Sequence, residues 1–496
     1  MDLKKYSGFG KTFWAVIVAE IHERGAWYGL FSLLPLYLTG PVNEGALGLD
    51  HSQKGTILGV VPFFLYLLPL ISGTIGDKIG YKKVLLASFA ILALGYYLLS
   101  FAVGYYSFFA LFMLIGLGAG MFKPMASGTV ARVTKGDMAK SSVGFAVFYM
   151  MINLGGLIAP LVSGLFRPSA ETVSMNGVIT TTVTGSWNNV FYLSSAYMVF
   201  MFFWTLFMYK ELPREKGTEK TLLTKFREMF TDIATNPKLL ILLVIFVGFW
   251  TMFIQIHNML PNWITEWVDT SALARHLPVK SWTTHGQIKA EIITSVDPFV
   301  IILFNVMVAA VVSKFRILRV IVGGIAVASL AFLLMPISGM EGWGSMFAIL
   351  FITMFAFGEM ASSPKFTELM GRIAPAGKEG TYQAYGFLSV AGGFLLGGKL
   401  SALYGDFADK TAMYKGILSG QYGVSSASMK DIGVYDLAEM LRSRGVDLAQ
   451  LNQNLWDSHK PYMVWVIVAS VGLLAAVALL VYNKFVPKIG ADSNES

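Results

Sequence analysis

Three ionisable side chains lie close together inside the first long apolar run of the chain. Glu20, Glu23 and Arg24 interrupt residues 13–38, a stretch long enough to cross a lipid bilayer. Each of them costs roughly 2.5–3.5 kcal/mol to insert at the centre of a membrane helix. Glu20 lies four residues before Arg24 and three before Glu23, so all three can share one helix face. Such a cluster usually faces a path for substrate, ions or protons, and it predicts a transporter.

The elements that must position this cluster are membrane helices. Of the 496 residues 55% are hydrophobic and 14% charged, whereas soluble domains carry about 25% charged residues. Further apolar runs lie near 53–76, 83–103, 106–131, 141–165, 190–209, 239–268, 294–313, 317–337, 345–364, 381–404 and 461–485. Because irregular backbone is not tolerated against lipid, we expect an all-α polytopic membrane protein with 12 transmembrane helices in two six-helix bundles.

The distribution of positive charge predicts the orientation of these helices. Lysine and arginine gather in alternate loops, at Lys4, Lys5, Lys11, Lys78, Lys82, Lys83, Arg132, Lys135, Lys140, Lys314, Arg316 and Arg319. By the positive-inside rule both termini are cytoplasmic, and we expect a multi-pass protein of the inner (plasma) membrane. Orientation thus accounts for the net charge of +8, and we expect no nucleic-acid partner.

A polar segment divides the chain. Residues 213–237 are expected to form a cytoplasmic linker with an amphipathic helix, between an N-terminal six-helix bundle at 1–212 and a C-terminal one at 238–486. Residues 405–459 form a polar insert on the extracytoplasmic side, and 487–496 a cytoplasmic tail. Two helical stripes predict a short hairpin in the insert, structural rather than substrate-binding: Val434, Leu437, Ala438 and Leu441, then Leu448, Leu451 and Leu455.

Catalytic chemistry is not indicated. The chain has no cysteine, which excludes disulfides, thiolate metal sites and a cysteine nucleophile. It also lacks HExxH and GxSxG motifs, so we expect no enzyme activity and no metal site.

Glycines and an acid recur at fixed spacing after the second apolar run. Gly73, Asp77 and Gly80 precede the lysines of a tight loop, where glycine permits the turn and the acid can pair with a neighbouring helix. This spacing resembles the loop signature of the major facilitator superfamily. The resemblance implies a loop that participates in conformational change.

Further motifs resemble one family within that superfamily. They are EIHERGAWYG at 20–29, FKP at 122–124, FYMMINLG at 148–155, FW at 249–250, SVDP at 295–298, GE at 358–359 and SP at 363–364. In this order they are similar to the signature set of the proton-dependent oligopeptide transporter family (POT, or PTR). The resemblance implies a proton-coupled symporter that imports di- or tripeptides or similar small zwitterions by alternating access.

The resemblance also implies roles for individual residues. Glu20 and Glu23 would accept protons beside Arg24 and Lys123, and the two cations would also attract the carboxylate of a peptide. Glu359 and Asn153 would hold its ammonium group. Tyr28, Tyr66, Trp250 and Gln255 fall near mid-membrane and would line the substrate site, although packing explains the aromatic residues equally well. The expected partners are a small-molecule substrate, protons and the lipid bilayer, with no cofactor beyond the proton gradient and a monomeric protein.

Several positions depart from the family pattern. Phe31 and Ile254 replace an arginine and a glutamate that form a gate pair between the two halves of family members. Replacing both charged residues together avoids leaving one buried charge without a counter-charge. Lys123 would then pair with Glu20 or Glu23, or have a lowered proton affinity. Asp297 replaces an asparagine, and we expect it to be a helix N-cap. The departures keep an alternative open: a major facilitator carrier or exporter of a non-peptide small solute or anion.

Overall fold

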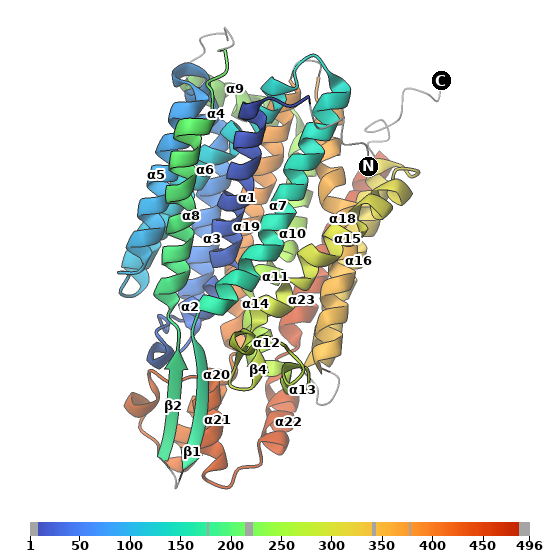
Figure 1. Cartoon of the computed structure of the whole chain (residues 1–496). Coiled ribbons are helices and arrows are strands. Elements are labelled where there is room, and N and C mark those ends of the chain that lie inside the picture. The colour runs from blue at the N-terminus through green and yellow to red at the C-terminus, as the bar shows by residue number, and fades with distance from the viewer. Residues whose placement is uncertain (1–7, 176–177, 214–221, 340–343, 376–377, 486–496) are drawn as a thin grey trace.

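A computed structural model describes residues 8–175, 178–213, 222–339, 344–375 and 378–485. Figure 1 shows long helices packed side by side, with smaller elements at both ends of the bundle. One end carries α9 (Leu222–Thr235) and is called the linker end. The other carries two strands and several short helices and is called the hairpin end.

Eleven helical segments of the described residues are long and apolar enough to cross a membrane, by length and composition alone. The charged helix α1 (Lys11–Phe31) packs along α7 and α8 and completes the expected two sets of six. The N-terminal half comprises α1, α2 (Leu34–Thr39), α3 (His51–Leu67), α4 (Pro69–Ile79), α5 (Tyr81–Leu99), α6 (Tyr105–Val133), α7 (Met138–Phe166) and α8 (Trp187–Met208). The all-α polytopic fold is thereby confirmed for the spans.

The C-terminal half begins with a broken helix. The bounds are α10 (Pro237–Phe253), α11 (Gln255–Asn258), α12 (Leu260–Trp267), α14 (Ala290–Thr294), α15 (Val296–Val312), α16 (Ile317–Ala331), α17 (Met335–Ser338), α18 (Gly344–Arg372), α19 (Glu379–Phe407) and α23 (Met463–Phe485). Pro261 lies in the first turn of α12 and lacks the backbone N–H that a continuous helix would need, consistent with the break at Met259.

The two halves meet most closely along α3 and α19. A Cβ placed on Gly55 would lie 2.3 Å from the carbonyl oxygen of Gly398, and one on Gly59 would lie 3.2 Å from the carbonyl oxygen of Phe394. Only glycine allows the two backbones to approach this closely. Both contacts lie toward the hairpin end, since α3 begins there and α19 ends there. The halves are therefore closed against each other at that end.

Strands at the hairpin end were not anticipated from the sequence. β1 (Ser169–Met175) pairs antiparallel with β2 (Val178–Thr184), and a second pair joins β3 (Thr283–Thr284) to β4 (Gln287–Ile288). Residues 178–184 are all valine, isoleucine or threonine, β-branched residues that are typical of a strand. All four strands lie outside the spans.

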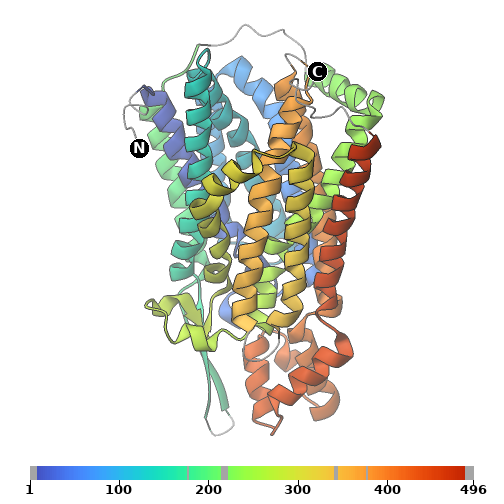
Figure 2. The same ribbon diagram turned by 90° about the vertical axis from the view of Figure 1, so that its right-hand side faces the viewer.

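The insert adds helices to the same end. α20 (Lys410–Tyr422) extends beyond α19, and α21 (Val434–Arg442) and α22 (Leu448–His459) occupy the two stripes identified in the sequence. Gly445, between them, has a φ of 77°, a value that glycine adopts readily. Figure 2 shows these helices protruding together with β1 and β2, while α9 lies at the linker end.

Candidate functional site

The three ionisable groups of α1 form a buried cluster within the N-terminal half. Arg24 donates from Nε and Nη2 to the two carboxylate oxygens of Glu23, at 2.6 and 2.7 Å. The Arg24 Nε also lies 3.7 Å from Glu20 Oε1. All three side chains are at most 5% exposed. The guanidinium of Arg24 is bound by both oxygens of Glu23, and the cluster has two carboxyls for one arginine. The second carboxyl can therefore bind a proton.

Lys123 reaches the same cluster from α6. Its ammonium group lies within electrostatic influence of Arg24, Glu23 and Glu20. It sits 4.1 Å from the ring centroid of Tyr66, a cation–π distance. No hydrogen bond from its Nζ atom is found among the described residues. Of the partners expected for Lys123, the acids of α1 are close, but the direct contact is aromatic.

A close helix crossing holds α1 against α7. A Cβ on Gly155 would lie 2.9 Å from the carbonyl oxygen of Ile21 and 3.0 Å from Cβ of Arg24. The glycine of the FYMMINLG segment is therefore required for backbone approach beside the cluster. Asn153, two residues earlier, donates to the carbonyl oxygen of Tyr149 on its own helix at 2.9 Å. That bond uses one of its two amide N–H donors, and its side-chain oxygen can accept from a substrate.

Acidic groups of the C-terminal half lie across from these cations. Glu359 on α18 is half-buried, and Asp297 on α15 is its acidic neighbour. Asp297 lies in the first turn of α15, yet Ser295 is the N-cap and Oδ1 of Asp297 is buried with no hydrogen-bond partner among the described residues. The expectation of a capping role for Asp297 was therefore wrong. The carboxyl of Asp297 instead interacts electrostatically with the carboxyl of Glu359.

Tyr28 connects the two charged regions. Its ring lies 5.8 Å from the Arg24 guanidinium carbon, and its phenol is within electrostatic influence of Glu359. Tyr149 on α7 is likewise close to Glu359 and Asp297. Phenols of the N-terminal half thus border both the cations and the acids. Tyr149 was not singled out from the sequence, although it lies inside a quoted motif.

Two predicted substrate residues, Gln255 and Trp250, pack against α19. Gln255 is fully buried and donates through Nε2 to the carbonyl oxygens of Thr251 and Gly397, at 2.7 and 3.1 Å. These bonds join α11 to α19, whereas the side-chain Oε1 of Gln255 is buried with no hydrogen-bond partner among the described residues. Trp250 packs over Gly393 and stacks edge-on with Phe253, but its indole Nε1 is buried without a partner. Such an unsatisfied donor costs free energy unless a ligand or water accepts from it.

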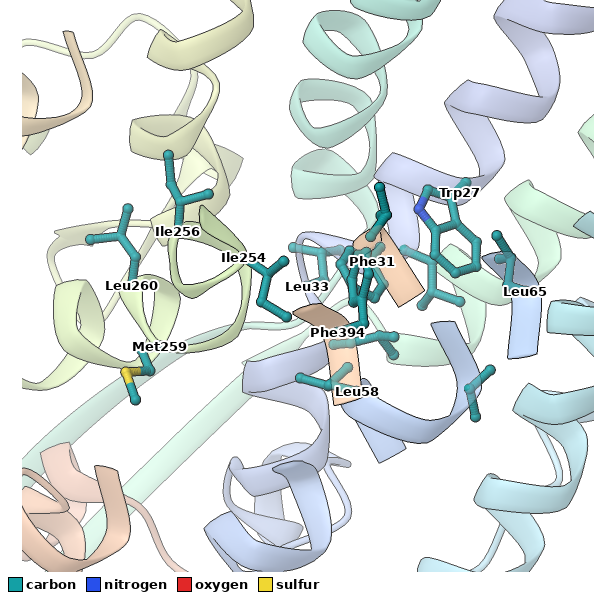
Figure 3. Packing of buried hydrophobic residues seen from close by; sticks show 14 of the residues in the cluster. Trp27, Phe31, Leu33, Leu58, Leu65, Ile254, Ile256, Met259, Leu260 and Phe394 are labelled. Carbon is teal, nitrogen blue, oxygen red and sulfur yellow. The ribbon is translucent and has the colours of Figure 1, made fainter. Parts of the chain in front are cut away.

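An apolar layer occupies the position of the missing gate pair. Phe31, Ile254 and Phe394 are all buried, and Figure 3 shows them together between the halves. Phe31 and Phe394 have ring centroids 6.2 Å apart in an edge-on arrangement. The layer excludes water where a charged pair would have required compensation.

The turn between α4 and α5 contains a glycine, and the acid before it pairs with a neighbouring helix, as the sequence predicted. Asp77 Oδ1 accepts from Arg132 Nη2 at 2.6 Å and from the Tyr81 hydroxyl at 3.1 Å. Gly80 has a φ of 101°, and a Cβ there would lie 2.7 Å from a carboxylate oxygen of Glu211. Glu211 in turn accepts from two backbone N–H groups at the start of α5. A Cβ on Gly73 would lie 3.8 Å from Pro124, so α4 runs close to α6 there.

Sequence similarity to curated relatives covers about a third of the chain. The matched part is 33% identical to the peptide transporter YePEPT of Yersinia enterocolitica over 165 residues, 31% of this chain and 32% of that protein. It is 30% identical to a di-/tripeptide transporter of Lactococcus lactis over 164 residues, 32% of this chain and 33% of that protein. The chain therefore spans about a third of the length of the curated relatives it matches.

Solved structures share the fold over nearly the whole chain. A POT family transporter in complex with a thioalcohol-conjugated peptide superposes with a TM-score of 0.70 at 17% identity, covering 98% of this chain and all of that one (100%). A nucleoside transporter superposes with a TM-score of 0.66 at 15% identity, covering 95% and 99%. The fold expected from the resemblance to the POT family is confirmed by the match to the POT family transporter. A family model for the Major Facilitator Superfamily matches residues 20–398, and the chain belongs to that superfamily.

Proposed function

We propose that the protein is a proton-coupled symporter that imports di- or tripeptides, or similar small zwitterions, by alternating access. One observation carries this proposal: Arg24 and Lys123 belong to the N-terminal half, whereas Glu359 and Asp297 belong to the C-terminal half and have no ion pair among the described residues. Arg24 and Lys123 suit a carboxylate, and Glu359 beside Asp297 suits an ammonium group. A zwitterion placed between the halves would satisfy both ends.

The cluster on α1 supplies the proton site in this proposal. Arg24 offsets one carboxylate through its bidentate contact with Glu23, while Glu20 lies at the longer distance of 3.7 Å. A buried carboxyl with an incomplete counter-charge favours the protonated form. Protonation and substrate binding are coupled because the substrate carboxylate competes with Glu20 and Glu23 for the same guanidinium and ammonium groups.

Relatives provide independent support for the substrate class. The matched proteins named above are peptide and di-/tripeptide transporters. The central acids and cations are of the types that bind the termini of a short peptide. We therefore take short peptides as the substrate class, protons and the lipid bilayer as the other partners, and cytoplasmic termini in a plasma membrane.

Uptake into proteoliposomes tests the proposal. Labelled dialanine should accumulate when an inward proton gradient is imposed, and Glu20→Gln should remove the stimulation by the gradient. Asp457→Asn, which changes an exposed carboxyl of α22, is the matched control and should transport as the parent does. Absence of gradient-stimulated uptake for every short peptide tried would refute the symport of peptides.

A substitution at Glu359 tests the ammonium site. Glu359→Gln should weaken peptide binding by about 1.5–3 kcal/mol, the usual contribution of a charged hydrogen bond. N-acetylated peptides, which lack the ammonium group, should lose much less. Equal losses for both peptides would show that Glu359 does not bind the amino end.

A non-peptide anion is the second candidate substrate. The specific observation in its favour is that Lys123 has an aromatic contact but no hydrogen-bonded carboxylate among the described residues. The apolar layer at Phe31 and Ile254 also removes the cross-half charges expected of peptide carriers. Gradient-driven uptake of a small inorganic or carboxylate anion, with none of dialanine, would favour this candidate.

A further inference from the structure

The insert of the C-terminal half binds the N-terminal half directly. α21 lies against β1 and β2 at the hairpin end, as Figure 1 shows. β1 and β2 follow α7 in the chain, whereas α21 lies between α19 and α23. A Cβ on Gly433, just before α21, would lie 2.9 Å from Cγ of Pro41 in the loop after α2. The insert and the N-terminal half are therefore in tight contact.

Asp436 is the centre of this contact. Its Oδ1 accepts from the hydroxyls of Thr172 and Thr181 at 2.7 and 2.5 Å. Its Oδ2 accepts from Asn43 Nδ2 at 2.9 Å. The residue is only 3% exposed. All three donors belong to the N-terminal half, and no side chain of its own half donates to Asp436 among the described residues.

The strand pair β1–β2 determines the arrangement of these donors. Thr172 and Thr181 are cross-strand partners in the register of β1 and β2, so both hydroxyls lie on the same face. They are also 3.1 Å from each other. The backbone adds one more link, because the Asn43 N–H donates to the carbonyl oxygen of Asp431 at 3.0 Å. The hairpin thus presents a preformed site for one carboxylate.

A histidine reinforces the same junction from another loop of the C-terminal half. His285 Nε2 lies 3.0 Å from Glu44 Oε1, and its Nδ1 lies 3.1 Å from the Thr172 hydroxyl. The ring stacks on Tyr435 of α21 at a centroid distance of 4.3 Å. Its backbone N–H donates to the carbonyl oxygen of Ala170 at 2.6 Å. His285 therefore joins the same three elements: the hairpin, α21 and the loop after α2.

We propose that Asp436, with the hydrogen-bond donors of β1, β2 and the loop after α2, forms a latch that holds the hairpin end closed. This inference rests on the proposed alternating access, in which the halves must separate at that end once in each cycle. A scaffold that only supported the insert would pair Asp436 with its own half. Instead, each of its hydrogen bonds must break when the halves separate, so the latch stabilises the conformation closed at the hairpin end.

The absence of cysteine in the natural chain allows a direct test. Ile254→Cys places a single thiol in the apolar layer, where the parent residue is 1% exposed. A membrane-impermeant maleimide is then added to the extracytoplasmic side of intact cells. Asp436→Ala on this background should raise the labelling rate about tenfold, which corresponds to about 1.4 kcal/mol of lost closure. An unchanged rate would overturn the latch.

Two controls separate the latch from general damage. Asn43→Ala removes one of the three side-chain hydrogen bonds and should raise labelling less than Asp436→Ala does. Asp457→Asn alters an exposed carboxyl of the neighbouring helix α22 and should leave labelling unchanged. Faster labelling in Asp457→Asn would indicate loosening of the whole insert and would also refute the specific role of Asp436.

A distance measurement covers the case in which Asp436→Ala does not fold. Spin labels at Val42→Cys and Ser443→Cys, both exposed parent positions, report the separation of the loop after α2 from α21. Asn43→Ala should add a second, longer distance, and a single unchanged distance would contradict the latch. Neither experiment requires transport, so failure of peptide uptake and failure of the latch give different results.

Discussion

The charged cluster near the middle of the molecule is paired within one half, whereas two contacts at the hairpin end, Arg167–Glu291 and His285–Glu44, join the halves. Arg24 binds Glu23 on the same helix. By contrast, Arg167 of the N-terminal half lies 2.5 Å from Glu291 of the C-terminal half. Partners on one helix stay together when the halves move, whereas cross-half partners must part. In the proposed function, the middle binds protons and substrate, and the hairpin end controls opening.

An apolar layer of Phe31, Ile254 and Phe394 separates these two regions. Phe31 and Ile254 stand where relatives are expected to have a cross-half ion pair, and the structure has no compensating charges in the layer within the described residues. Cross-half polar contacts lie instead at the hairpin end, at Arg167, Glu291, His285 and Asp436.

The largest effect is expected from removing the cation of the central cluster. Arg24→Met leaves two buried carboxyls, Glu20 and Glu23, without their counter-charge, which should cost about 3–5 kcal/mol. The melting temperature in detergent should fall and gradient-driven uptake should be lost. Arg319→Met, at an exposed position of α16, is the control and should melt as the parent does. A melting temperature unchanged in Arg24→Met would show that the cluster contributes nothing to stability.

A smaller effect is expected from putting charge back into the apolar layer. Phe31→Arg alone buries an uncompensated charge and should destabilise the protein by about 3 kcal/mol. Ile254→Glu alone should have a similar effect, and the double variant should recover most of the loss if the two side chains meet. Thermal unfolding of the four proteins gives the coupling energy. Additive losses would show that positions 31 and 254 do not face each other.

The smallest effect concerns pH at the hairpin end. Lys289, just outside α14, donates through Nζ to the carbonyl oxygens of Gly164 and Arg167, at 2.8 and 3.1 Å. Burial, followed by the charge of Arg167, lowers the pKa of Lys289 from its ordinary 10.5 to about 7, while Glu291 opposes the shift. Opening exposes the amine to water and returns its pKa toward the ordinary value.

The sign of the pH effect follows from these two states. Between pH 7 and pH 10.5 the open state binds more protons at Lys289 than the closed state, so raising the pH favours closure. Below about pH 7 the amine is protonated in both states and the dependence disappears. In the Asn43→Ala variant, the spin-label pair described above should show less of the long distance at pH 9 than at pH 7.5. Lys289→Gln should remove that difference, and a difference retained in this variant would assign it to another group.

Local patterns accounted for much of the central site. The excess charge of residues 20–24 identified the cluster, because ionisable groups are costly in a membrane helix wherever that helix packs. Helical spacing also placed Glu20, Glu23 and Arg24 on one face before any tertiary contact was known. The substrate-binding role of Gln255 stays a prediction. Its hydrogen bonds could not be read from the sequence, because the two carbonyls come from different helices and only the packed bundle brings them together.

The sequence by itself determined the membrane-spanning helices, the α1 cluster and the loop glycines, since each depends on hydropathy or on neighbours a few residues apart. Only the tertiary structure decided that α21 binds β1 and β2, that Arg167 pairs with Glu291 and that Asp297 lies beside Glu359. Asp436 and Thr172 are 264 residues apart in the chain. Contacts at such separations follow from how the two halves pack, and no local periodicity records that packing.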